Sequence, residues 1–101
     1  MKKYAFDEII RNINEHISVS GHNSYEDFYI GITSCPEKRF LEHKVNINDS
    51  WSITMPAIDS ETARKVEKYF LCRGMNGGDG GGNDDSIYVY CYIITPATID
   101  K

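Results

Sequence analysis

Three side chains suited to the chemistry of phosphate esters lie close together in the first half of the chain. Tyr29 belongs to a segment, residues 28–33, whose alternation predicts a strand, and Arg39 and His43 follow it four positions apart. Residues four apart share one face of a helix, and a helix is predicted at about residues 35–45. An arginine fork matches a phosphate in charge and shape, and a tyrosine or histidine can relay a proton from an attacking water. This spacing favours phosphodiester hydrolysis.

A later glutamate, Glu67, is the candidate metal ligand. It borders the apolar stripe of a predicted helix, where a carboxylate must be paired, bind a metal or point outward. Mg²⁺ often takes one protein carboxylate together with water and substrate oxygens, so Glu67 is a suitable ligand for such a cation. The simpler interpretation is a surface ion pair with a nearby cation, Lys38, Arg64 or Lys68.

Arg39 and His43 also have ordinary interpretations. The arginine could pair with Glu37 or Glu42 on the surface of its own helix, which would contribute about half a kcal/mol. The histidine could be a partly buried, hydrogen-bonded side chain. Both alternatives stay open at the level of the sequence.

The elements that would position these residues alternate in type. Apolar residues at three- and four-residue intervals predict a covering helix at about residues 4–18. After the second helix, a third one begins with Asp59 or Ser60 as its cap and meets Gly74 in its last turn. Strands are predicted at residues 28–33, at about 51–55 and at about 87–94.

The order α-β-α-β-α-β predicts an α/β domain of the α+β type, with a small, three-stranded, mostly antiparallel sheet covered by three helices. Pro56 would end the second strand or confine it to an edge. A glycine-rich loop at residues 74–85 precedes the last strand. In that strand the aliphatic residues face one way, and the opposite row, which would be covered or would stack bases, is Tyr88, Tyr90 and Tyr92.

Composition limits the class of protein. With 101 residues and 41% hydrophobic content, residues 1–101 form a single domain with one core. A net charge of −4 weakens a simple nucleic-acid-binding interpretation, because phosphate neutralisation needs a surplus of Lys and Arg. No apolar run approaches the length needed to span a bilayer, so no membrane association is expected.

The three cysteines, Cys35, Cys72 and Cys91, are odd in number, lack a CxxC spacing and occur without a signal-peptide pattern. They are expected to be free thiols in a reducing cytoplasm. Cys72 and Cys91 are expected in the core.

Taken in order, Tyr29-Ile30-Gly31, Arg39, His43 and a later helix carrying Glu67 resemble the GIY-YIG nuclease superfamily. The resemblance covers a motif core from about residue 28 to about residue 73. It implies that the tyrosine, the arginine and the histidine gather around the scissile phosphate, and that the glutamate holds one divalent cation, Mg²⁺ or Mn²⁺. The implied activity is endonucleolytic hydrolysis of phosphodiester bonds in DNA.

Two departures from the family pattern are visible. The chain lacks the Gly-Ile-Tyr strand that normally precedes Tyr-Ile-Gly. The C-terminal strand could replace it in a permuted sheet, by pairing beside the strand of Tyr29 and supplying a second phenol from Tyr88 or Tyr90. The family's late asparagine corresponds to Asn83 or Asn76, and Asn83 is favoured.

The leading expectation is a cytoplasmic, metal-dependent endonuclease that acts on DNA, or on RNA in its place. Nucleases of this family usually take specificity from an attached domain, so a protein partner could supply it here. The alternative is a catalytically silent module that binds nucleic acid or protein, which the acidic composition and the missing first motif support. A third interpretation is an unrelated small α/β protein that carries the motif by coincidence.

Overall fold

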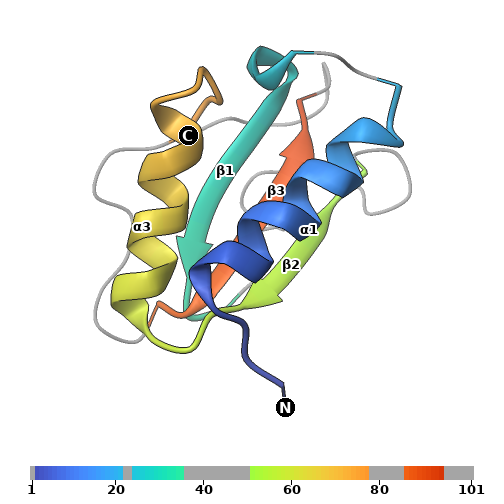
Figure 1. Cartoon of the computed structure of the whole chain (residues 1–101). Helices are drawn as coiled ribbons and strands as arrows, with labels where there is room; N and C mark the ends of the chain where they lie inside the picture. Colours follow the sequence, from blue (N-terminus) through green and yellow to red (C-terminus); the bar gives the residue numbers. More distant parts are fainter. Residues whose placement is uncertain (1, 22–23, 36–50, 78–85, 95–101) are drawn as a thin grey trace.

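The computed structural model describes residues 2–21, 24–35, 51–77 and 86–94 (Figure 1). In chain order its elements are α1 (Phe6–Ser18), a short 3₁₀ turn (Tyr25–Asp27), β1 (Phe28–Thr33), β2 (Ile53–Pro56), α3 (Ser60–Leu71) and β3 (Tyr88–Ile93). The three predicted strands and two of the three predicted helices are confirmed. The helix predicted at about 35–45 falls on residues outside the described ranges.

The strands form an antiparallel sheet in the order β1-β3-β2, so the last strand in sequence lies in the middle (Figure 1). β1 pairs with β3 along its whole length, from Phe28 opposite Ile93 to Thr33 opposite Tyr88. β2 pairs with the other edge of β3. The predicted pairing of the C-terminal strand beside the strand of Tyr29 is confirmed.

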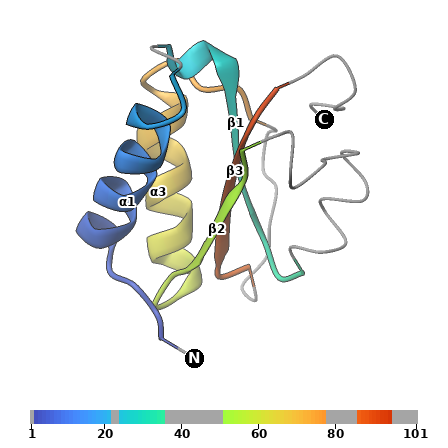
Figure 2. The same ribbon diagram turned by 90° about the vertical axis from the view of Figure 1, so that its right-hand side faces the viewer.

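The helices α1 and α3 lie side by side on one face of this sheet (Figure 2). Alternate strand residues point toward them, and buried side chains from both layers form one continuous core that includes Ile9, Ile13, Ile30, Val66, Phe70 and Cys91. Burial of these apolar side chains is the main driving force for folding. Among the described residues, no helix is long and apolar enough to cross a membrane.

The helix α1 begins at Phe6, two residues later than predicted, because Tyr4 is used in a bridge to the end of β2. The Tyr4 amide donates to the Pro56 carbonyl at 2.9 Å, and the Ile58 amide donates to the Tyr4 carbonyl at 3.1 Å. The Ala5 amide, at the N-cap of α1, donates to the Glu8 carboxylate at 3.3 Å. The chain therefore enters α1 from an extended segment.

The helix α3 is capped by Asp59, whose carboxylate accepts a hydrogen bond from the Thr62 amide at 2.7 Å. The helix ends at Leu71, and Gly74 follows with a φ of 106°, which glycine adopts without strain. Cys72 is exposed, so its predicted place in the core is wrong. It lies at the C-cap, beyond Phe70, the last buried residue of the helix.

The strand β2 begins at Ile53, and Trp51 lies outside it with a φ of 49°. The Trp51 indole donates to the His16 carbonyl at 2.8 Å, and the His16 ring is hydrogen-bonded to the Trp51 carbonyl at 2.7 Å. This reciprocal pair ties the entry of β2 to the last turn of α1. The alternation that predicted a strand from residue 51 is overridden by this contact.

Candidate active site

Three tyrosines form a stack on the sheet face opposite the helices. The register places Tyr29 directly opposite Tyr92, with ring centroids 5.2 Å apart, and Tyr90 lies 6.3 Å from each of them. The three rings are within 16° of parallel. This tyrosine stack (Tyr29, Tyr90 and Tyr92) is a cluster separate from the main core, as expected from the strand period of two.

The tyrosine stack is buried: Tyr29 and Tyr90 are each 1% exposed, and Tyr92 is 0% exposed. Two of the predicted site residues, Tyr29 and Tyr90, are thus brought together, but neither offers a free ring face to solvent. Base stacking on the C-terminal row needs exposed aromatic faces. The burial of Tyr90 and Tyr92 therefore argues against that interpretation.

Gly31 makes the stack possible. It lies opposite Tyr90 in the register, and the Tyr90 ring passes directly over its Cα. A Cβ atom at Gly31 would overlap the Tyr90 phenol, with Cε1 only 2.8 Å away. The glycine of Tyr-Ile-Gly therefore has a packing role in this chain.

Tyr88 is the most accessible tyrosine of the row. It is half-buried and lies opposite Thr33 on β1 and Pro56 on β2. This is the end of β1 from which the chain continues toward Arg39. Of the two tyrosines proposed as the second phenol, Tyr88 is the one whose side chain reaches solvent.

Glu67 is half-buried on the side of α3 that faces the edge of β1. Leu71, one helical turn later on the same side, packs against the segment that borders β1. A Cβ at Gly77 would lie 2.6 Å from the Leu71 side chain and 2.9 Å from the Ile30 carbonyl. Tyr69 lies on the other side of α3, where it contacts α1. Glu67 therefore faces away from α1.

The height of Glu67 along β1 follows from helix geometry. The helix α3 runs antiparallel to β1 (Figure 1), and four helical residues advance about 6 Å, or about two residues of strand. Because Leu71 is level with Ile30, Glu67 lies roughly level with Ile32. The helix α3 and the tyrosines occupy opposite faces of the sheet. A site that includes both the Glu67 carboxylate and a tyrosine phenol would therefore lie at the edge of β1, near Thr33.

The surroundings of Glu67 oppose its ionisation. Burial raises the pKa of the carboxyl to about 7, and the Arg64 guanidinium opposes part of this shift. A bound cation would favour the charged form, so the position fits a metal ligand. In the described part of the chain, no group of three or more His, Cys, Asp or Glu side chains could hold a metal ion.

The remaining predicted site residues are Arg39, His43 and Asn83, and all three lie outside the described residues. Asn76, the competing asparagine, has a structural role. The backbone N–H of Asn76 donates to the Phe28 carbonyl at 3.0 Å, and the backbone carbonyl of Asn76 accepts from the Ile30 N–H at 2.8 Å. Asn76 therefore extends the outer edge of β1.

Tyr92 is a residue that sequence reasoning did not include in the candidate site. Its place on the face opposite the aliphatic residues was predictable from the strand period. Its position directly across from Tyr29 depends on the register between β1 and β3. Turn length sets the register of a hairpin, but these two strands are far apart in sequence.

Comparison with protein-family models, with curated proteins and with solved structures finds no match to the chain.

Proposed function

We propose that the chain is a metal-dependent endonuclease of the GIY-YIG type whose sheet is completed in permuted order. The observation that carries the proposal is the central place of β3, which brings the C-terminal tyrosines beside the strand of Tyr29. The row on β3 supplies the phenols that an earlier Gly-Ile-Tyr strand would otherwise supply. The substrate class is DNA, with RNA as the second substrate to be tested.

In this proposal Glu67 holds one Mg²⁺ or Mn²⁺, which when bound would neutralise charge on the substrate phosphate. Its position supports this role, because a bound cation would favour the charged carboxylate and so offset the burial that raises the pKa to about 7. Arg39 would stabilise the added negative charge of the transition state, and His43 would relay a proton from the attacking water. Asn83 would contribute an amide to the same site.

The phenols take different roles. Tyr88 is half-buried at the end of β1 where the chain continues toward Arg39, which supports it as the tyrosine that positions the attacking water. Tyr29 and Tyr90 are buried in the tyrosine stack, so they would hold β1 and β3 in register below the site. Proton transfer at pH 7 then rests on the histidine more than on a buried phenol.

The test is cleavage of supercoiled plasmid, single-stranded DNA, branched DNA and RNA in Mn²⁺. Loss of charge stabilisation or of the metal ligand should lower the rate of Arg39→Ala and Glu67→Gln by about 100-fold or more. Glu61→Gln is the matched control, because Glu61 is an exposed residue of the same helix, and its rate should stay within about twofold of wild type. The proposal is contradicted if neither the wild type nor any of the three variants cleaves a substrate. It is also contradicted if the wild type and the three variants all cleave at the same rate.

Metal binding has its own readout. A cation that binds only the folded protein raises its Tm with concentration, so Mn²⁺ should raise the Tm of the wild type and of Glu61→Gln. Glu67→Gln should lose this response. An unchanged response in Glu67→Gln would place the metal elsewhere.

A catalytically silent module is the second candidate. Its support is the burial of Tyr29 and Tyr90, at 1% exposure each, because a tyrosine must reach solvent to contact a phosphate. This candidate predicts binding of DNA without cleavage, and no effect of Mn²⁺ on the Tm of the wild type. Fluorescence anisotropy with labelled DNA, run beside the cleavage assay, separates the two functions.

A further inference from the structure

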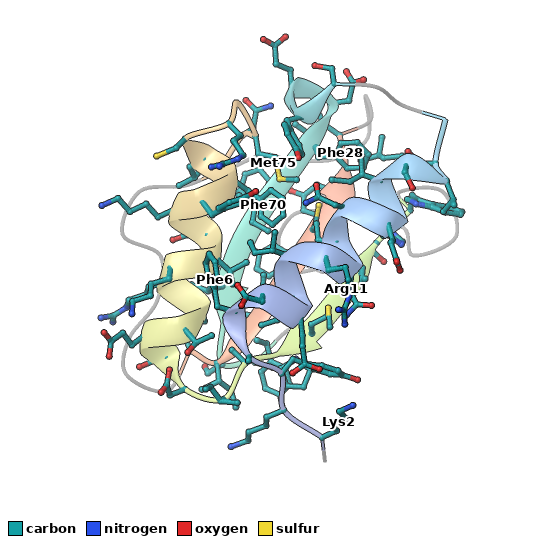
Figure 3. The ribbon with its side chains drawn as sticks, viewed as in Figure 1. Lys2, Phe6, Arg11, Phe28, Phe70 and Met75 are labelled. Atoms are coloured by element: carbon teal, nitrogen blue, oxygen red, sulfur yellow. The ribbon has the colours of Figure 1, made fainter. Side chains whose placement is uncertain are left out.

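A groove of about 560 Å³ lies between the start of α1 and the C-terminal half of α3. Phe6 projects from the first turn of α1 toward α3 (Figure 3) and meets the Tyr69 ring edge to face, at a centroid distance of 5.9 Å. Cys72 adds an exposed thiol at the end of α3. The exposed lining of this α1–α3 groove is mainly apolar.

The rim of the α1–α3 groove is positively charged. Lys65, Lys68 and Arg73 line it against a single carboxylate, Asp7. Within the described ranges the chain has seven Lys and Arg but eight Asp and Glu, so three of seven cations gather at a place that holds one of eight carboxylates. The groove therefore concentrates positive charge on a chain whose net charge is −4.

Internal ion pairs do little to neutralise this rim. Lys65 lies 3.5 Å from Glu61, but the two side chains are 66% and 78% exposed, and such exposed pairs are weak. The Arg73 guanidinium lies over the Tyr69 ring at 3.5 Å and donates to the Tyr69 carbonyl at 3.1 Å. These contacts fix the position of the Arg73 charge without cancelling it.

The lining distinguishes between two classes of anionic partner. A nucleic acid bound through its bases needs an open aromatic face, whereas one face of Tyr69 is covered by Arg73, and both Phe6 and Phe70 approach the ring nearly at right angles. A nucleic acid bound through its phosphates would leave the apolar floor unused. A peptide that carries an apolar side chain between carboxylates matches the floor and the rim together.

We propose that the α1–α3 groove docks an acidic peptide segment of a partner protein. One apolar side chain of the peptide packs on Phe6, Tyr69 and Cys72. Carboxylates on either side of it pair with the cationic rim, chiefly with Lys68. The proposal is independent of the nuclease proposal, because Glu67 does not line the groove and no catalytic residue is used.

The probe is a short fluorescein-labelled peptide with one leucine flanked by aspartates and glutamates, followed by anisotropy against the intact chain. Three matched probes accompany it: the same peptide with glycine for leucine, the same peptide with lysines for the acidic residues, and labelled oligo-dT. The acidic leucine peptide should bind, with an affinity that falls as salt is raised. The glycine and lysine peptides should bind at least about tenfold more weakly, a difference of about 1.4 kcal/mol.

Variants locate the binding site. Lys68→Glu should weaken binding of the acidic peptide at least about tenfold, because like charges across an interface repel. Lys3→Glu is the matched control, since Lys3 is exposed and outside the groove, and it should bind within about twofold of wild type. Asp7→Asn removes the only carboxylate among the described lining residues and should tighten binding about two- to threefold, a gain that a damaged fold would not produce.

Several outcomes overturn the proposal. One is the absence of binding, and another is equal weakening by Lys68→Glu and Lys3→Glu. Binding of oligo-dT that depends on Lys68, without binding of the peptide, would make the groove a nucleic-acid surface. Self-association of the chain that Lys68→Glu abolishes, measured by sedimentation, would make a second copy the occupant.

Discussion

Among single residues, Glu67 carries the clearest conflict between its chemistry and its surroundings. Half-burial beside Phe70 and Leu71 disfavours the charged carboxylate and raises its pKa from 4.5 to about 7. Between these two values the folded protein holds a proton that the unfolded chain releases. The free energy of unfolding therefore falls as the pH rises through this window, and the loss is complete above about pH 7.

This conflict can be measured with Glu67→Gln, which mimics the protonated carboxyl. The variant should match wild type at about pH 4 and be more stable at about pH 8 by roughly 1–2 kcal/mol, after allowance for solvent screening. Urea unfolding in EDTA from about pH 4 to pH 8 gives the difference. Glu61→Gln, the exposed control, should show no such trend, and a pH-independent difference for Glu67→Gln would contradict the assignment.

Among the elements, the pair β1 and β3 depends on one close approach, that of Tyr90 over Gly31. Gly31→Ala should lower the free energy of unfolding by about 1–3 kcal/mol, because a methyl group cannot fit under a buried ring. In a Tyr90→Val background the overlapping atoms are gone, so the same change should cost little. A double-mutant cycle by urea unfolding measures this coupling, and an equal cost in both backgrounds would exclude the overlap as its cause.

The sequence predicted the type and place of these elements well. Residues 28–33 form a strand as predicted, and the helix capped by Asp59 ends at Leu71, within one helical turn of Gly74. Local periodicity is sufficient for such predictions, because each helix or strand buries one face. Trp51 was placed in a strand wrongly, because its conformation depends on His16, which is distant in sequence.

The candidate site was less predictable than the elements. Alternation assigned Tyr29 and Tyr90 to one face of the sheet, and the structure places them there in contact. Their near-complete burial and the position of Tyr92 opposite Tyr29 depend on long-range packing and register, which alternation does not encode. The roles of Arg39 and His43 in the site stay predictions.

At the scale of the whole molecule, the thiols separate surface from interior. Cys35 and Cys72 are exposed, whereas Cys91 is buried in the middle of the central strand, where burial raises the pKa of its thiol. The thiolate is the reactive form, so Cys91 is protected from thiol reagents both by its burial and by its protonation. Its reactivity should report on global unfolding.

With Ellman's reagent in native buffer, two thiols should react promptly and the third only through the unfolded state, slower by about 1,000-fold or more. Denaturant should make all three react at similar rates. Cys72→Ser should leave one prompt thiol, which assigns the fast phase. Prompt reaction of three thiols in native buffer would show that the central strand opens without unfolding of the domain.

The central place of β3 also determines when the sheet can form during synthesis. Among the described strands, β1 and β2 make no ladder with each other, and the ladder that each of them forms is with residues 88–93. A nascent chain translated as far as residue 77 holds both outer strands and both described helices, yet it lacks the strand that joins them. The two outer strands must therefore wait, with their inner edges unpaired, until the ribosome has delivered the strand that fits between them.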